Sequence, residues 1–285
     1  MGSESYSSGR QTVSLSFAEF AFGKKEVATS TENPNPKRMV VYSTGWPWDA
    51  SAKPTWDFPG QLSEGLNATC YSITTRSERD DPQGMVLQAA ATRQFLMKHG
   101  LDKDTELIIV GHSAGVRKGA YLAKDLQDHD TPAAVLASVS PMGLNSRSIV
   151  GLLKDFVRDV FITGKKERQI AGVKAGDKNP VVDKVSEQEV QSGFRDSLKK
   201  KWQVGGVRGI WSQIKALVKE DPIYSQIKVP IIDIAPDRDM VSNRRSYISE
   251  AGAKSNVSVL TSQQQLELSG RLWDAKMDRI RKRDN

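Results

Sequence analysis

Residues 107–115 read LIIVGHSAG, an apolar run that leads directly into the pattern Gly-x-Ser-x-Gly around Ser113. The run before the first glycine is typical of a strand buried inside a parallel sheet, and the residues from Val116 onward favour a helix. A serine between two glycines at such a turn is forced into a strained backbone conformation, because the turn is too tight for β-carbons on its neighbours. The stretch therefore predicts that the Ser113 side chain stands clear of the sheet, where a nucleophile would lie.

Strand-like and helix-like segments alternate along most of the chain. Residues 12–22 alternate apolar and polar side chains, which predicts an early antiparallel strand or hairpin, and the Pro- and Trp-rich segment 46–60 predicts a long loop. The other predicted strands are 38–45, 69–74, 105–115 with its turn, 133–141, 229–236 and 256–262, and the predicted helices are 61–66, 81–101, 116–130 and 268–280. This order predicts an α/β fold with a mostly parallel sheet and helices on both faces.

The alternation breaks once, between residues 144 and 222. This stretch is helical in character and lies between two predicted strands, which indicates a helical cap inserted into the fold. It holds sixteen Lys or Arg and ten Asp or Glu residues, and so carries +6 of the chain's net charge of +7. We therefore expect a core formed by residues 1–143 and 223–285, with residues 144–222 as the cap.

Composition narrows the possible classes of protein. The single cysteine, Cys70, excludes an internal disulfide and suits a reducing compartment, and no apolar run reaches the ~20 residues that span a bilayer. No signal-peptide pattern follows the polar start, so a cytoplasmic location is expected. His and Cys residues lack the spacing of metal ligands, and no glycine-rich phosphate loop is present. We expect no metal and no cofactor.

The basic residues are interspersed with acidic ones and accompany no nucleic-acid motif, which favours a solvated surface and predicts no nucleic-acid partner. Peripheral contact of the basic cap and tail with a membrane surface is a weaker alternative. The expected partner is a small molecule. The sequence does not indicate an oligomeric state.

The order of these features resembles the α/β-hydrolase superfamily over roughly residues 35–285, the cap excluded. The resemblance implies that Ser113 is the nucleophile and that Thr44-Gly45 replaces the usual His-Gly of the oxyanion loop. The backbone N–H groups of Trp46 and Ala114 would then form the oxyanion hole. The cap falls where this superfamily commonly carries one.

The resemblance also implies an acidic residue after a late strand. The sequence VPIIDIAPDRDMVS fits this position, with Asp239 the better match and Asp237 the second. A histidine should follow the last strand, but that window holds Gln263, Gln264 and Gln265 instead. Glutamine neither accepts nor stores a proton near neutral pH, so none of the three can replace a histidine as the base.

The three histidines of the chain are poor substitutes. His112 adjoins Ser113, but neighbours at a tight turn point in different directions, which favours a packing role. His99 ends a predicted helix at the opposite end of the sheet. His129 ends the helix that follows Ser113, about 22 Å from its start at ~1.5 Å per residue. A carboxylate such as Glu267, or a lysine of the cap, remains an alternative base.

Two functions remain open. One is a serine hydrolase acting on a carboxylic ester or related acyl substrate through Ser113, with Asp239 orienting the base. The other is a non-catalytic member of the same fold that binds a small molecule or a protein, since no histidine follows Asp239. Gly45, Trp48 and His112 are expected to line the substrate pocket. Trp46, Trp48 and Trp56 form either an aromatic wall for an apolar group or a packed loop.

Overall fold

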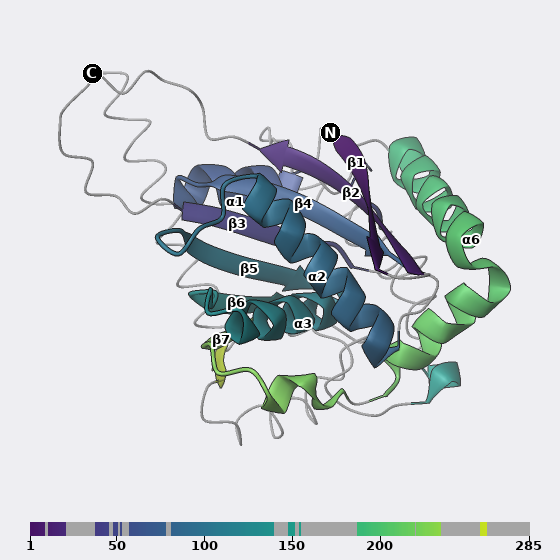
Figure 1. Ribbon diagram of the computed structural model, residues 1–285. Helices are drawn as coiled ribbons and strands as arrows, with labels where there is room; N and C mark the ends of the chain where they lie inside the picture. The colour runs from purple at the N-terminus through teal and green to yellow at the C-terminus, as the bar shows by residue number, and fades with distance from the viewer. Residues whose placement is uncertain are drawn as a thin grey trace, which may run out of the picture.

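The computed structural model describes residues 1–8, 11–20, 38–45, 48–50, 52, 57–77, 81–139, 148–151, 154, 187–219, 221–234 and 257–260. Eight strands form one sheet in the spatial order β1-β2-β4-β3-β5-β6-β7-β8 (Figure 1). The strands are β1 (Gly2–Ser8), β2 (Gln11–Phe20), β3 (Arg38–Ser43), β4 (Thr69–Arg76), β5 (Glu106–His112), β6 (Val135–Val139), β7 (Ile231–Ile234) and β8 (Val257–Leu260).

The sheet is mostly parallel. From β4 to β8 every neighbouring pair runs parallel, whereas β2 is antiparallel both to β1 and to β4. The carboxyl ends of the parallel strands therefore meet at one edge, and Ser113 follows β5 at that edge. This confirms the predicted α/β architecture.

Helices cover both faces of the sheet. The helix α2 (Pro82–Lys98) and the helix α3 (Ala114–Asp128) pack on one face, against side chains such as Met39 and Val41 of β3. The helix α1 (Asp57–Leu66) packs on the other face, against Val40 and Tyr42. Side chains alternate between the two faces of a strand, and both sets in β3 are buried, as expected for a strand inside a parallel sheet.

Two segments differ from the sequence expectations. Residues 2–8 form an edge strand, although the polar start predicts none; its side chains alternate between half-buried and exposed, which is enough for pairing with β2. The helix α1 begins at Asp57, inside the predicted loop 46–60. Pro59 lies in the first turn of that helix, where a missing N–H leaves no intrahelical hydrogen bond unmade.

The predicted cap, residues 144–222, contributes α6 (Glu187–Leu217), and the short 3₁₀ helix η3 (Pro222–Ser225) begins at its last residue and leads into β7. Gly206 has φ 54° and ψ −154°, so α6 is two helices joined at a kink. Glycine adopts this backbone without the penalty that a β-carbon brings. Leu217 and Val218, at the end of α6, are buried against Ala114 and Ile149.

Candidate active site

Ser113 occupies the turn between β5 and α3 with φ 53° and ψ −120°, a backbone conformation that residues with a β-carbon rarely adopt. Its N–H donates to the carbonyl of Val139 at the end of β6 (2.8 Å), and its carbonyl accepts from Val116 N–H (3.1 Å). The residue is half-buried. The strained turn expected from the sequence is therefore present, held by neighbours on both sides.

The two glycines of the motif are required by close packing. A β-carbon on Gly111 would lie 2.7 Å from the Val116 nitrogen, and one on Gly115 would overlap the Ser43 carbonyl oxygen. Such approaches are closer than real β-carbons make, and the atoms in the way belong to the main chain. Gly111 therefore allows the first turn of α3 to fold back against the end of β5, and Gly115 allows that turn to pack against the end of β3.

The loop that follows β3, residues 44–52, is called the β3 loop below. At its start, a β-carbon on Gly45 would lie 2.9 Å from His112 Nδ1 and 3.2 Å from Ser113 Cβ. Gly45 is buried, and His112 is half-buried beside it. The structure thus brings Gly45, His112 and Ser113 together, while the predicted substrate-pocket role of Gly45 and His112 stays a prediction. Ala114 is the first residue of α3, and its half-buried position is covered by Leu217 and Val218.

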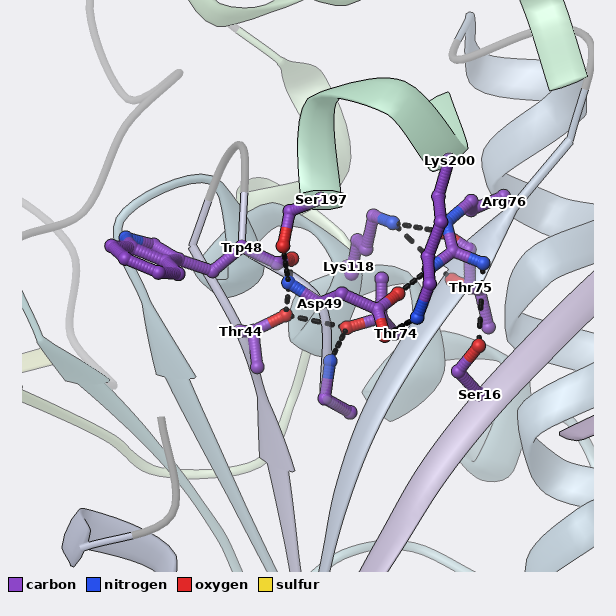
Figure 2. Close-up of polar contacts among 11 residues, drawn as sticks. Ser16, Thr44, Trp48, Asp49, Thr74, Thr75, Arg76, Lys118, Ser197 and Lys200 are labelled. Atoms are coloured by element: carbon purple, nitrogen blue, oxygen red, sulfur yellow. Dashed lines mark hydrogen bonds and ion pairs between the residues drawn. The ribbon is translucent and has the colours of Figure 1, made fainter. Parts of the chain in front are cut away.

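The β3 loop is hydrogen-bonded to β4 (Figure 2). Thr44 Oγ1 lies 2.6 Å from Thr74 Oγ1 and donates to the Trp48 carbonyl (3.2 Å). Ala50 N–H donates to Thr74 Oγ1 (2.8 Å), and Trp48 N–H donates to the Gly45 carbonyl (2.9 Å). These contacts fix the course of the chain next to Ser113. Trp48 is half-buried, and its indole extends away from the polar cluster on the far side of the loop.

That polar cluster centres on Asp49, which is 2% exposed. Its carboxylate forms an ion pair with Arg76 of β4 and accepts from Lys200 Nζ of α6 (3.2 Å), while its N–H donates to Ser197 Oγ (3.2 Å). Arg76 also donates to Ser16 Oγ of β2 (3.2 Å). Burial lowers the pKa of Arg76 to about 10, and burial followed by the Arg76 charge lowers the pKa of Lys200.

Sequence reasoning missed this cluster. Asp49 lies in a segment noted only for its prolines and tryptophans, and its ionic partners are 27 and 151 residues further along the chain. No periodicity or local motif connects positions so far apart.

A second buried ion pair joins α3 to η3. The side chains of Arg117 and Asp221 are 6% and 3% exposed, and they are in direct contact. Tyr121 OH donates to both carboxylate oxygens of Asp221, at 3.1 and 3.2 Å. Burial, followed by the Asp221 charge, raises the pKa of Tyr121 to about 12. This pair holds the segment leaving α6 against the helix that begins after Ser113.

The other histidines are placed far from Ser113. His99 caps the end of α2, where its ring packs against Phe17, Tyr71 and Phe95 near the start of β4. His129 caps the far end of α3, with its Nδ1 2.7 Å from the Asp125 carbonyl. Neither lies within reach of the Ser113 hydroxyl.

Several predicted site residues lie outside the described part of the chain: Trp46, Trp56, Asp237, Asp239, Gln263, Gln264, Gln265 and Glu267. Their predicted roles stay predictions. The strands that precede them are described, however. Because β7 and β8 run parallel to β5, both end at the sheet edge where β5 leads into Ser113.

The described residues form a small cavity of about 20 Å³, enough for one water molecule, between the sheet and the helices α2 and α3. Its polar lining consists of Ser43, Thr75, Gln88, Thr92 and Lys118. It is on the inner side of α3, and Ser113 does not line it. Within the described ranges no group of three or more His, Cys, Asp or Glu side chains could hold a metal ion. No helix among those same residues is long and apolar enough to cross a membrane.

No protein-family model matches the sequence, and no curated protein matches it. Solved structures do match over nearly the whole chain. One is a carboxylesterase of the ammonia-oxidising thaumarchaeon Nitrososphaera gargenis, with a TM-score of 0.53, 14% identity and 97% of each chain covered. Another is a thermophilic esterase of Thermogutta terrifontis, with a TM-score of 0.52, 14% identity and 99% of each chain covered.

A third is a bromoperoxidase of Bacillus anthracis, with a TM-score of 0.52 and 13% identity, covering 91% of this chain and 90% of that one. This chain has the α/β-hydrolase fold. At 13–14% identity the similarity of this chain to the three structures shows the fold alone. One fold can host different activities, and the three are named as two esterases and a bromoperoxidase.

Proposed function

We propose that this protein is a serine hydrolase acting on a carboxylic ester or a related acyl substrate, with Ser113 as the nucleophile. The observation that carries the proposal is the backbone of Ser113, held at φ 53° with Gly45 packed directly beside it. A non-glycine residue in this conformation stores strain of about 1–3 kcal/mol. Strain of this kind is characteristic of a serine presented for attack at a strand-to-helix turn.

The chemistry follows from the arrangement. Ser113 Oγ forms a bond to the acyl carbon, and the electron pair of the carbonyl moves onto its oxygen. In this proposal the N–H groups of Ala114 and Trp46 donate to that oxyanion, one from the start of α3 and one from the β3 loop. Collapse releases the alcohol, which takes the proton lost by Ser113, and water then hydrolyses the acyl-serine to the acid.

The base is the open element of this scheme. Asp239 would orient the base. The base is not a histidine after β8, because the sequence has no histidine beyond His129. Loss of one triad member leaves a residual rate about 10³–10⁴ above that of water, supplied by the oxyanion hole and by binding. We therefore expect slow turnover.

The missing histidine also favours a second candidate, a non-catalytic protein that binds a ligand between the sheet and the cap. His99 and His129 are committed to other contacts, at the far ends of their helices. A binding protein of this kind would keep the elbow geometry without needing a base.

The deciding experiment is hydrolysis of a short p-nitrophenyl ester by the parent protein and by its Ser113→Ala variant. Labelling with a fluorophosphonate probe is run beside it, because a reactive serine is labelled once even where turnover is slow. We expect slow hydrolysis and labelling in the parent, both lost in Ser113→Ala. Turnover restored by histidine at position 263, 264 or 265 would identify the place of the base. An unlabelled, inactive parent that no histidine rescues would favour the binding protein.

A further inference from the structure

We propose that Asp49 is a positioning residue that links helix α6 to the β3 loop, so that the position of α6 controls the loop beside Ser113. Its kinetic consequence rests on the proposed function. The mechanical link itself does not, since it consists of contacts that exist whether or not the protein turns over a substrate.

On the loop side, Asp49 is four residues beyond Gly45 and lies within a hydrogen-bonded frame. Trp48 N–H and Ala52 N–H close turns onto the carbonyls of Gly45 and Asp49, both at 2.9 Å. Ala50 N–H is held by Thr74 Oγ1 (2.8 Å). A shift of Asp49 is therefore transmitted to the main chain at Gly45 through one short turn.

On the helix side, α6 contacts both the main chain and the side chain of Asp49. Ser197 Oγ accepts from Asp49 N–H, and Lys200 Nζ donates to its carboxylate, each at 3.2 Å. Residues 197 and 200 are three apart, so they lie on the same face of α6. Figure 2 shows both side chains descending from the helix onto the loop.

The two ionic contacts of Asp49 differ in how easily they can open. Arg76 belongs to the sheet and its side chain is 7% exposed, so separating it from Asp49 would leave two buried charges. The Lys200 side chain is 43% exposed and can be solvated when it leaves. The structure thus has a fixed contact on the sheet side and a releasable one on the α6 side.

The other half of α6 reaches the residue that follows Ser113. Leu217 and Val218 pack on Ala114, whose N–H is the second proposed oxyanion donor. Gly206, with its positive φ and open surroundings, separates this half from the half that carries Ser197 and Lys200. Helix α6 therefore contacts the β3 loop through Asp49 and the residue after Ser113 through Ala114, with a kink between the two contacts.

The test uses Ser197→Ala and Lys200→Met, each removing one α6 contact from Asp49. Lys199→Met is the matched control, because Lys199 is the exposed neighbour on the same helix. Hydrogen–deuterium exchange is measured on the peptide covering residues 44–52, beside kcat and KM for the ester. We expect amide exchange in this peptide to accelerate about three- to tenfold in both test variants, as for loss of one hydrogen bond or ion contact.

We also expect both test variants to lower kcat with little change in KM, and Lys200→Arg to retain parental behaviour. Loop exchange that stays at the parental rate in both test variants, or that rises equally in Lys199→Met, would overturn the inference. An inactive parent whose loop exchange still responds to the two substitutions would count against the proposed function and support the link. A parent that hydrolyses the ester, but whose loop exchange does not respond to the two substitutions, would support the proposed function and count against the link.

Discussion

Gly115 lies so close to the end of β3 that a β-carbon on it would overlap the carbonyl oxygen of Ser43. The two residues are 72 positions apart, yet their main chains are in contact. This contact fixes the start of α3, and with it Ser113, relative to the strand that leads into the β3 loop.

Gly115→Ala is therefore expected to destabilise the fold by at least about 2 kcal/mol, since the neighbouring atom is backbone and cannot move aside cheaply. It should also lower ester hydrolysis, because Ser113 is two residues away. Urea unfolding gives the free energy. Gly65→Ala is the control: Gly65 is exposed near the end of α1 with open space around it, and alanine there should be neutral or stabilising by less than about 1 kcal/mol. Equal effects of the two substitutions would contradict the packing argument.

Asp221→Asn should be strongly destabilising, by about 3–5 kcal/mol, because it removes the buried carboxylate charge that contacts the Arg117 guanidinium. The comparison is Asp128→Asn on α3, where the carboxylate is 52% exposed and pairs with Lys124 one turn earlier. That change should cost less than about 0.5 kcal/mol. Denaturant titration of both variants measures the free energy of unfolding. A decrease of less than about 1 kcal/mol for Asp221→Asn would contradict the predicted role of the buried ion pair.

Cys70 should be inert in the folded protein. The residue is fully buried, and burial raises the pKa of its thiol to about 12, so almost no thiolate exists at pH 8. A chromogenic disulfide reagent at pH 8 should titrate no thiol in the native protein and one after unfolding in guanidinium. Rapid reaction of the native protein would show that β4 opens readily at this position.

Glu4 provides a pH-dependent test of the edge strand β1. Hydrogen bonds from Lys98 Nζ (2.8 Å) and Tyr6 OH (2.6 Å) lower its pKa. A carboxyl group with a lowered pKa in the folded state stabilises that state above its ordinary value of 4.5, and the effect disappears as the pH falls through the lowered value. Glu4→Gln should therefore reduce stability at pH 7 by less than about 1 kcal/mol and have no effect at strongly acidic pH.

The local signals in the sequence predicted most of the sheet and the elbow. The helix α2 begins as expected, with Asp81 accepting from Gly84 N–H (2.9 Å) and proline at the next position, and Gly100 beyond its end has φ 96°. The turn at Ser113 is determined by its two flanking glycines, because a β-carbon on Gly111 would collide with the main chain of Val116, five residues further along the chain. Features of this kind depend on residues close together in the chain, so they can be recognised in one sequence.

Other features depend on pairings that no local pattern displays. Asp49 with Lys200, and Arg117 with Asp221, join positions more than 100 residues apart, and each residue alone resembles an ordinary surface charge. The strand β1 was missed for a related reason. Most of its residues are serines, which have little strand propensity of their own, and they form a strand by pairing with the edge of β2.

At Ser113 the positive φ lowers stability, whereas the proposed chemistry needs the serine hydroxyl. Glycine accepts this conformation without strain, so Ser113→Gly should match or exceed the parent in melting temperature, while Ser113→Ala keeps the β-carbon and should not gain. Both variants lack the hydroxyl. A chain under selection for stability alone would be better served by glycine at this turn, so keeping serine there costs stability, as expected if the hydroxyl has the role proposed for it.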